Sequence, residues 1–290
     1  RLSTHLSYGT LSIREVFQAS MGRVKKLKES GAVRQGEWLK SLGAFQSRLH
    51  WHCHFIQKLE SAPQFEVENA HPSYIGIRSE SAPKKDNIEA WINGRTGFPF
   101  IDACMRALRS TGWINFRARA MLQSFASYHL WIHWRFSGVL LAQLFTDYEP
   151  GIHYSQIQMQ SGITGINAVR IYNPIKQGLE HDPQGKFIKK WIPELKDISI
   201  NFIHEPWLLS RFNQEEYEQI NYIRPIIDIP ISTKTAKKKI QEITKKDGYW
   251  DISKEIYLKH GCRKSPRKNI NNKKNVSKEK EKQYELKLDF

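Results

Sequence analysis

The chain has 290 residues, with 45 Lys and Arg against 29 Asp and Glu, and a formal net charge of +16 at pH 7. Its apolar runs are shorter than the roughly 20 residues that cross a bilayer, which excludes a membrane-spanning helix. Three widely spaced cysteines exclude a disulfide framework and fit a reducing compartment. We therefore expect a cytoplasmic monomer without a membrane anchor or a metal, and the charge favours a polyanionic partner.

No signal peptide is visible. The first residue is Arg1 and not Met, so we expect a fragment or a processed form of a longer chain. Residues 62–85 contain three prolines and predict a long loop, with the extended run FEVEN inside it. Farther along, apolar residues recur at helical spacing in three stripes: Ile101, Met105 and Leu108; Met121, Phe125 and Ile132; Val139, Leu140, Leu144 and Phe145.

Helical periodicity dominates and strand-like alternation is scarce, so the sequence predicts an all-α fold with long loops. We predict one large helical domain over residues 1–210 and a helical extension of the same domain over residues 211–262. Residues 263–290 are rich in Lys, Asn, Ser and Glu and predict a basic, disordered tail.

The most specific motif is RTGFPFIDACMRALRSTGWINFRARAMLQSFASYHLWIHWR, from Arg95 to Arg135. Four further motifs follow it in order: DYEPGIH (147–153), RIYNPIKQG (170–178), DPQGKFIKKWIPEL (182–195) and HEPW (204–207). Fainter matches, RLSTHLSYGTLS (1–12) and RLHW (48–51), lie upstream. Together the motifs resemble the FAD-binding domain of the photolyase/cryptochrome family, blue-light flavoproteins that repair pyrimidine dimers in DNA or signal in light. The resemblance implies an all-α FAD-binding domain, without the family's N-terminal antenna domain in this chain.

The resemblance places Arg119 beside the flavin, paired with Asp147 of the Asp147-Tyr148-Glu149 element. Positive charge there would balance the anionic reduced flavin, although an ordinary salt bridge between helices is the alternative reading. His153 matches the position that faces flavin N5, where it could set the protonation of the reduced ring because imidazole titrates near neutrality. The residues expected to bind FAD are Leu2, Ser3, Phe45, Arg48, His52, Phe116, Arg119, Asp147, Tyr148, Glu149 and His153.

The expected lesion pocket departs from the family pattern. Trp51 is kept, but Arg48 and His52 stand where the family has Glu and Arg. Phe116 replaces an Asn, and Ala120 replaces a Met. Basic residues near the expected mouth include Arg106 and Lys176, and the residues that the resemblance assigns to DNA binding are Trp51, Arg109, Arg117 and Gln177.

The expected path of electrons to the flavin also departs from the family pattern. The family reduces its flavin through three tryptophans, of which Trp91 matches the outer member and Trp134 the middle one. Ile157 occupies the slot next to the flavin, so the path is expected to be broken unless another aromatic residue substitutes, for which the choices are Trp131, Tyr128 and Tyr154. The residues assigned to catalysis are Trp91, Trp134 and His153.

Three functions are compatible with this sequence. The first is a photolyase-type lyase that binds damaged DNA and splits pyrimidine dimers by electron transfer from reduced FAD. The second is a cryptochrome-like photoreceptor without repair activity, which the altered lesion contacts favour. The third is a basic helical DNA-binding domain without flavin, which would leave the Arg119, Asp147 and Glu149 constellation without a role.

Overall fold

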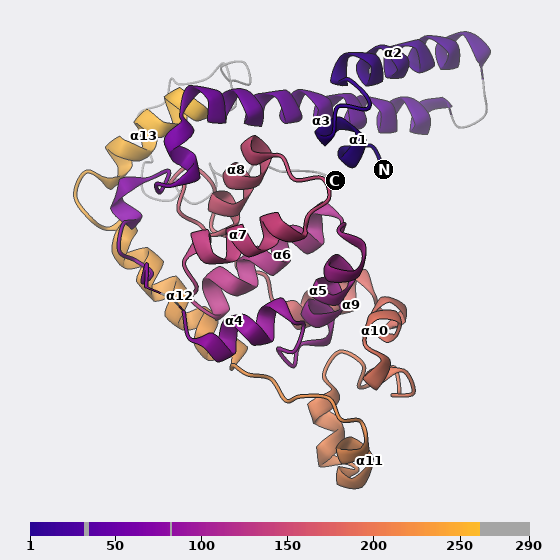
Figure 1. The fold of residues 1–290 in the computed structure, drawn as a ribbon, viewed down its shortest axis with the longest axis vertical. Helices are drawn as coiled ribbons and strands as arrows, with labels where there is room; N and C mark the ends of the chain where they lie inside the picture. The colour runs from indigo at the N-terminus through magenta and orange to yellow at the C-terminus, as the bar shows by residue number, and fades with distance from the viewer. Residues whose placement is uncertain (32–34, 82, 262–290) are drawn as a thin grey trace, which may run out of the picture.

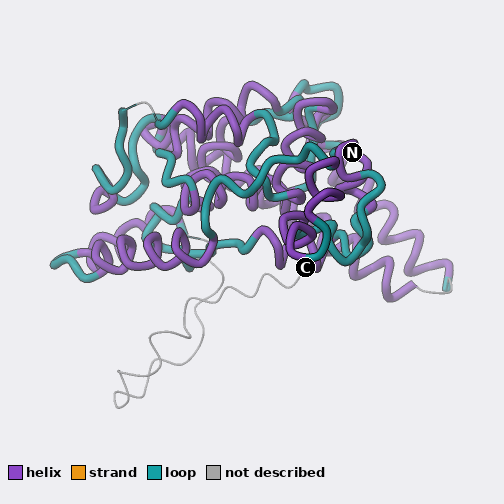
Figure 2. The backbone as a smooth tube through the Cα atoms, turned by 90° about the horizontal axis from the view of Figure 1, so that it is seen from below, coloured by secondary structure: helices purple, strands orange, loops and turns teal. Residues whose placement is uncertain are grey.

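The computed structural model describes residues 1–31, 35–81 and 83–261, and these residues form helices and loops without a strand (Figures 1 and 2). The expected all-α architecture is confirmed. The predicted tail at 263–290, and Cys262 before it, lie outside the described residues.

The structure contains thirteen labelled α-helices in its described part and several shorter helical turns. The α-helices are α1 (Ser3–Ser7), α2 (Ile13–Ser30), α3 (Gln35–Ser61), α4 (Lys85–Ile92), α5 (Pro99–Thr111), α6 (Phe116–Ser124), α7 (Trp134–Leu144), α8 (Pro150–Gln160), α9 (Pro174–His181), α10 (Lys186–Trp191), α11 (Gln214–Gln219), α12 (Ile229–Thr244) and α13 (Tyr249–His260). The turns are η1 (Pro63–Glu66), η2 (Pro72–Tyr74), η4 (Pro193–Leu195) and η5 (Pro206–Arg211), all 3-10, and the π-helical η3 (Phe125–His129).

The long helix α3 lies along one edge of the molecule and joins its parts. Helix α2 packs against the first half of α3, and the two form an arm (Figure 1). The second half of α3 packs on α8, which belongs to a body built from α4 to α9. Helices α12 and α13 cover another side of this body, and α11 lies at its far end (Figure 1). The contact between α3 and α8 is the one that assembles the site described below.

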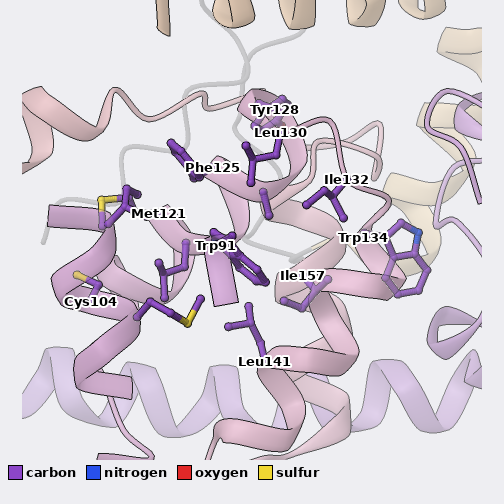
Figure 3. Packing of buried hydrophobic residues seen from close by; sticks show 14 of the residues in the cluster. Trp91, Cys104, Met121, Phe125, Tyr128, Leu130, Ile132, Trp134, Leu141 and Ile157 are labelled. Carbon is purple, nitrogen blue, oxygen red and sulfur yellow. The ribbon is translucent and has the colours of Figure 1, made fainter. Parts of the chain in front are cut away.

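The main core lies between α5, α6, α7 and α8, around the ring of Trp91 (Figure 3). Ile101, Met105 and Leu108 are buried on one face of α5, as the first stripe predicted. The third stripe is wrong at Val139, which faces solvent, because Leu141 takes the inward position on α7. The second stripe is buried but does not follow one helix. Its residues are divided between α6, the π-helical turn and the loop after it: Met121, Phe125 and Ile132.

The segment 62–85 is largely a loop, as predicted, but FEVEN is not extended. Its first two residues close η1, which begins at Pro63 with the fixed φ that suits a first helical position. Beyond residue 211, α12 packs on η3 and α13 contributes Tyr249 to the main core. The boundaries at 210 and 262 stay predictions.

Candidate flavin site

The Asp147-Tyr148-Glu149 turn connects α7 to α8 and is held against α3. Pro150 occupies the first turn of α8, and the Glu149 carboxylate accepts a hydrogen bond from the Gly151 amide at 3.2 Å. Gly151 allows a close approach, because a Cβ there would lie 2.7 Å from the Cα of Ile56 on α3. The N-terminal helix α1 also reaches this turn, since the Ser7 hydroxyl donates to the Tyr148 carbonyl at 2.6 Å. Helices α1 and α3, both distant in sequence, thus meet at this acidic turn.

Arg119 of α6 and Asp147 form an ion pair, with 2.9 Å between Nη2 and Oδ2. The Arg119 Nε also donates to the Ile114 carbonyl at 2.8 Å, and its guanidinium lies 4.2 Å from the centre of the Phe145 ring. The Asp147 side chain is 3% exposed and that of Arg119 is 25% exposed. The second carboxylate oxygen of Asp147 is buried without a hydrogen-bond partner among the described residues. An acceptor of this kind is costly unless a further group satisfies it.

His52 of α3 provides a second unsatisfied atom. Its Nδ1 is buried and has no hydrogen-bond partner in the described part of the chain. Burial lowers the pKa of His52, and the nearby Glu149 carboxylate opposes that shift. Phe45 and Arg48 precede His52 by seven and four residues on α3, so the three side chains share a helix face. Phe45 is half-buried and Arg48 is exposed.

His153 of α8 is buried, with 7% of its surface exposed, and its pKa differs from that of a histidine in solvent. Its Nε2 lies 2.9 Å from the Gly138 carbonyl oxygen, which can only accept, so Nε2 carries the proton. Burial lowers the pKa of His153 to about 4, and the Arg119 charge contributes in the same direction against the Gly138 hydrogen bond. The expectation that His153 titrates near neutrality is therefore wrong, because the buried ring is held in its neutral form.

The other residues expected at the flavin lie around this centre. The Ser3 hydroxyl accepts from the Trp113 indole nitrogen at 3.0 Å, and Leu2 is exposed beside it. The Tyr148 ring lies 5.2 Å from the His153 ring. Phe116 begins α6 with an exposed side chain. Buried atoms that lack partners, next to a partly exposed guanidinium, fit a bound group that brings its own donors and acceptors, as the flavin of FAD does.

The residues expected to bind DNA come from four different helices, α3, α5, α6 and α9. Trp51 is half-buried on α3, where its ring stacks on Phe55 with 5.6 Å between centroids. Arg109 is exposed at the end of α5 and donates to the Ile92 carbonyl at 3.3 Å. Gln177 is 8% exposed and donates to Glu180 at 3.1 Å, so little of its surface could meet DNA. Arg117 is exposed on the first turn of α6.

Two further basic residues near the expected mouth of the lesion pocket, Arg106 and Lys176, already pair with acidic residues. Arg106 pairs with Glu194 at 2.8 Å, and its Nε donates to the Gly94 carbonyl. Lys176 lies 3.7 Å from Glu180 across one helical turn. Exposed pairs of this kind contribute little to stability, but a paired cation is less available to a phosphate.

The aromatic residues show where the predicted electron path fails. Trp91 is 0% exposed, so its assignment as the solvent-facing member of the path is wrong. Trp134 is buried, with its indole donating to Asn69 at 2.6 Å, and its ring lies 6.3 Å from that of Tyr154. Ile157 is packed against Gly138 and buried.

Trp131 is a poorer substitute than Tyr154. Arg78 and Lys239 each place a cation 4.5 Å from the centre of its ring. Two adjacent positive charges disfavour the loss of an electron, which would leave a third.

The family motifs identified Tyr154 as a candidate residue. They did not identify Ser7, because the only indication in the sequence was its position in the helix that follows the RLS motif.

The described residues contain no helix that is long and apolar enough to cross a membrane. In the same residues, no group of three or more His, Cys, Asp or Glu side chains has the arrangement of a metal site.

Comparison with known proteins shows the family. The family model for the FAD binding domain of DNA photolyase matches residues 45–242. A deoxyribodipyrimidine photo-lyase of Streptomyces griseus is 31% identical over 230 residues, which are 79% of this chain and 46% of the relative. Cryptochrome-2 of Arabidopsis thaliana is 30% identical over 250 residues, covering 82% of this chain and 39% of the relative.

Solved structures agree. A class III photolyase from Agrobacterium tumefaciens matches with a TM-score of 0.72 and 25% identity, over 84% of this chain and 49% of that one. An archaeal photolyase from Sulfolobus tokodaii, solved with two FAD molecules, matches with a TM-score of 0.67 and 29% identity, over 83% and 50%. The chain spans about half the length of the relatives it matches. It belongs to the photolyase/cryptochrome family and contains that family's FAD-binding domain.

Proposed function

We propose that this chain is the FAD-binding part of a DNA photolyase, which uses light to split pyrimidine dimers. The observation that carries the proposal is the Arg119–Asp147 pair with its unsatisfied buried oxygen, inside residues 45–242, which match the family model for the FAD binding domain of DNA photolyase. The net charge of +16 supports a nucleic-acid partner.

The reduced flavin, when bound, supplies the electron that splits the dimer. Arg119 would supply positive charge to offset the negative charge of the reduced ring. Asp147 fixes the guanidinium through one oxygen, and its other oxygen would accept a hydrogen bond from the ligand. His153 keeps its proton on Nε2 through Gly138 and so stays neutral at physiological pH. Burial of Asp147 and His153 keeps water away from this end of the site.

The test is an absorption spectrum of the purified protein, followed by a light-dependent repair assay on thymine-dimer DNA. A bound flavin spectrum and repair in blue light are the expected results. A folded preparation that is colourless and takes up no FAD would contradict the proposal and favour the third function, a basic DNA-binding domain without flavin.

The second candidate is a cryptochrome-like photoreceptor. It is favoured by Arg48 and His52, which replace the residues that read the lesion in repair enzymes, and by the match to a plant cryptochrome. A flavin-loaded protein that responds to light but does not repair the dimer would select this candidate over the first.

DNA binding is expected to weaken steeply with salt. Neutralising Z phosphates gives a slope of about −0.9Z for log affinity against log salt on duplex DNA. Replacing Arg109 or Arg117 with Gln should reduce that slope by about 1 each if the side chain contacts phosphate. Arg106→Gln is the matched control, since the same charge is lost from a side chain already held by Glu194. Binding that does not depend on salt, measured by fluorescence anisotropy, would contradict this expectation.

Flavin photoreduction is expected to avoid the family's three-tryptophan path. Ile157→Trp should speed photoreduction by an external thiol, because it fills the missing slot. Tyr154→Phe should slow the wild-type reaction, because the Tyr154 ring is the aromatic neighbour of Trp134. Circular dichroism must show that the larger Trp side chain leaves the fold intact. If Tyr154→Phe has no effect, Trp134→Phe abolishes fast reduction and Ile157→Trp adds nothing, the path is intact and the assignment of Ile157 is wrong.

A further inference from the structure

A cavity of about 600 Å³ lies between α5, the loop into α6, and α10. Helix α10 packs on α5 (Figure 1). One face of α5 forms part of the wall, through residues spaced four, three and four apart: Phe100, Cys104, Ala107 and Thr111. The cavity has the size of a small-molecule site. No residue assigned to the flavin lines it.

The cavity is positively charged. Arg1, Arg117, His181 and Lys190 line it, and no acidic residue does so within the described chain. These four residues come from four separate segments, so their convergence is not a run of like charges along one helix. A site of this sign selects an anion.

The wall is also aromatic. The Phe187 ring lies 6.1 Å from that of Phe100 and 6.4 Å from that of Trp191, and Trp113 adds a fourth ring from the loop before α6. A cation lies beside each indole: Lys190 Nζ is 5.4 Å from the Trp191 ring centre, and the Arg1 guanidinium is 3.9 Å from that of Trp113. The wall of the cavity therefore presents flat aromatic faces and positive charges next to one another.

We propose that this cavity binds a nucleotide, with its base against the aromatic rings and its phosphate on Lys190 and His181. A free phosphate would make no use of the rings, and an uncharged aromatic ligand would make no use of the cations. Bases stack on aromatic side chains whatever their identity, so the site accepts the class and not one particular base. The nucleotide comes either from solution or from a single strand of nucleic acid.

The probe is adenosine monophosphate, titrated calorimetrically into the purified protein, with adenosine and inorganic phosphate as partial ligands. We expect the nucleotide to bind more tightly than either part. Lys190→Gln should weaken binding about tenfold, the effect of losing one charge-assisted contact, and His181→Ala should weaken it less, through the loss of one hydrogen-bond donor. Lys186→Gln is the matched control, because Lys186 carries the same charge on α10 but does not line the cavity. It should bind like the wild type.

Competition separates the two sources. If a short single-stranded oligonucleotide displaces the monophosphate, the ligand is a nucleotide of the strand; if it does not, the ligand is a free nucleotide. No binding at millimolar concentration by the folded protein, or equal affinity in Lys190→Gln and the wild type, would overturn the proposal. Flavin content should stay the same in Lys190→Gln, so failure here is separable from failure of the flavin site.

Discussion

Replacing Asp147 with Asn is expected to abolish flavin retention and to lower the free energy of unfolding by about 2–4 kcal/mol. Breaking a buried ion pair costs about 3–5 kcal/mol because the partner charge stays buried and unpaired. The loss here is placed somewhat lower because Arg119 is 25% exposed and can be partly hydrated. The substitution also replaces one carboxylate oxygen, which accepts hydrogen bonds, by an NH2 group, which donates them, beside the Arg119 guanidinium.

Flavin content of the purified variant, from its absorption spectrum, and urea unfolding followed by circular dichroism measure the two effects. Glu194→Gln is the matched control. It breaks an ion pair of similar length, Arg106–Glu194 at 2.8 Å, between two partly exposed side chains. We expect a loss below about 1 kcal/mol and an unchanged flavin content. Wild-type flavin content in Asp147→Asn would show that the pair is structural only.

The sequence was sufficient for the fold class and for the pairing of Arg119 with Asp147. The fold class follows from the helical spacing of apolar residues, whereas the pairing is what the resemblance to the photolyase/cryptochrome family implied. The structure brings these two residues to 2.9 Å, although their role toward flavin stays a proposal.

The features that the sequence could not supply depend on packing between distant segments. Trp91 matches a redox position in the motif, yet α4 carries it into the core. The π-helical turn η3 breaks the run of α-helix before Trp131, whose backbone φ of 55° is left-handed. No residue type in that stretch predicts such a break. The nucleotide cavity joins residues more than 180 positions apart, from Arg1 to Trp191, so no motif could reveal it.

His153 shows the same limit for a titratable group. Its ring is neutral because α7 places the Gly138 carbonyl against Nε2 and the neighbouring rings exclude water. The motif gave the position of this histidine, but its protonation is set by burial.

This burial makes the stability of the protein depend on pH in a defined direction. Above pH 6.5, His153 is neutral in both the folded and the unfolded chain. As the pH falls from 6.5 towards the folded pKa of about 4, the unfolded chain takes up a proton that the folded chain does not, so stability is lost. A shift from 6.5 to about 4 corresponds to about 3 kcal/mol, reached near pH 4 and constant below it.

We therefore expect the free energy of unfolding to fall between pH 6.5 and pH 4, and His153→Gln to remove part of this slope. Glutamine does not titrate, and its amide can still donate to the Gly138 carbonyl. Urea titrations at several pH values measure the slope. Other buried histidines whose pKa values are lowered by burial, such as His71 and His129, will leave a residual slope. If His153→Gln follows the wild type, His153 is protonated in the folded protein and the proposed neutral ring beside the flavin is wrong.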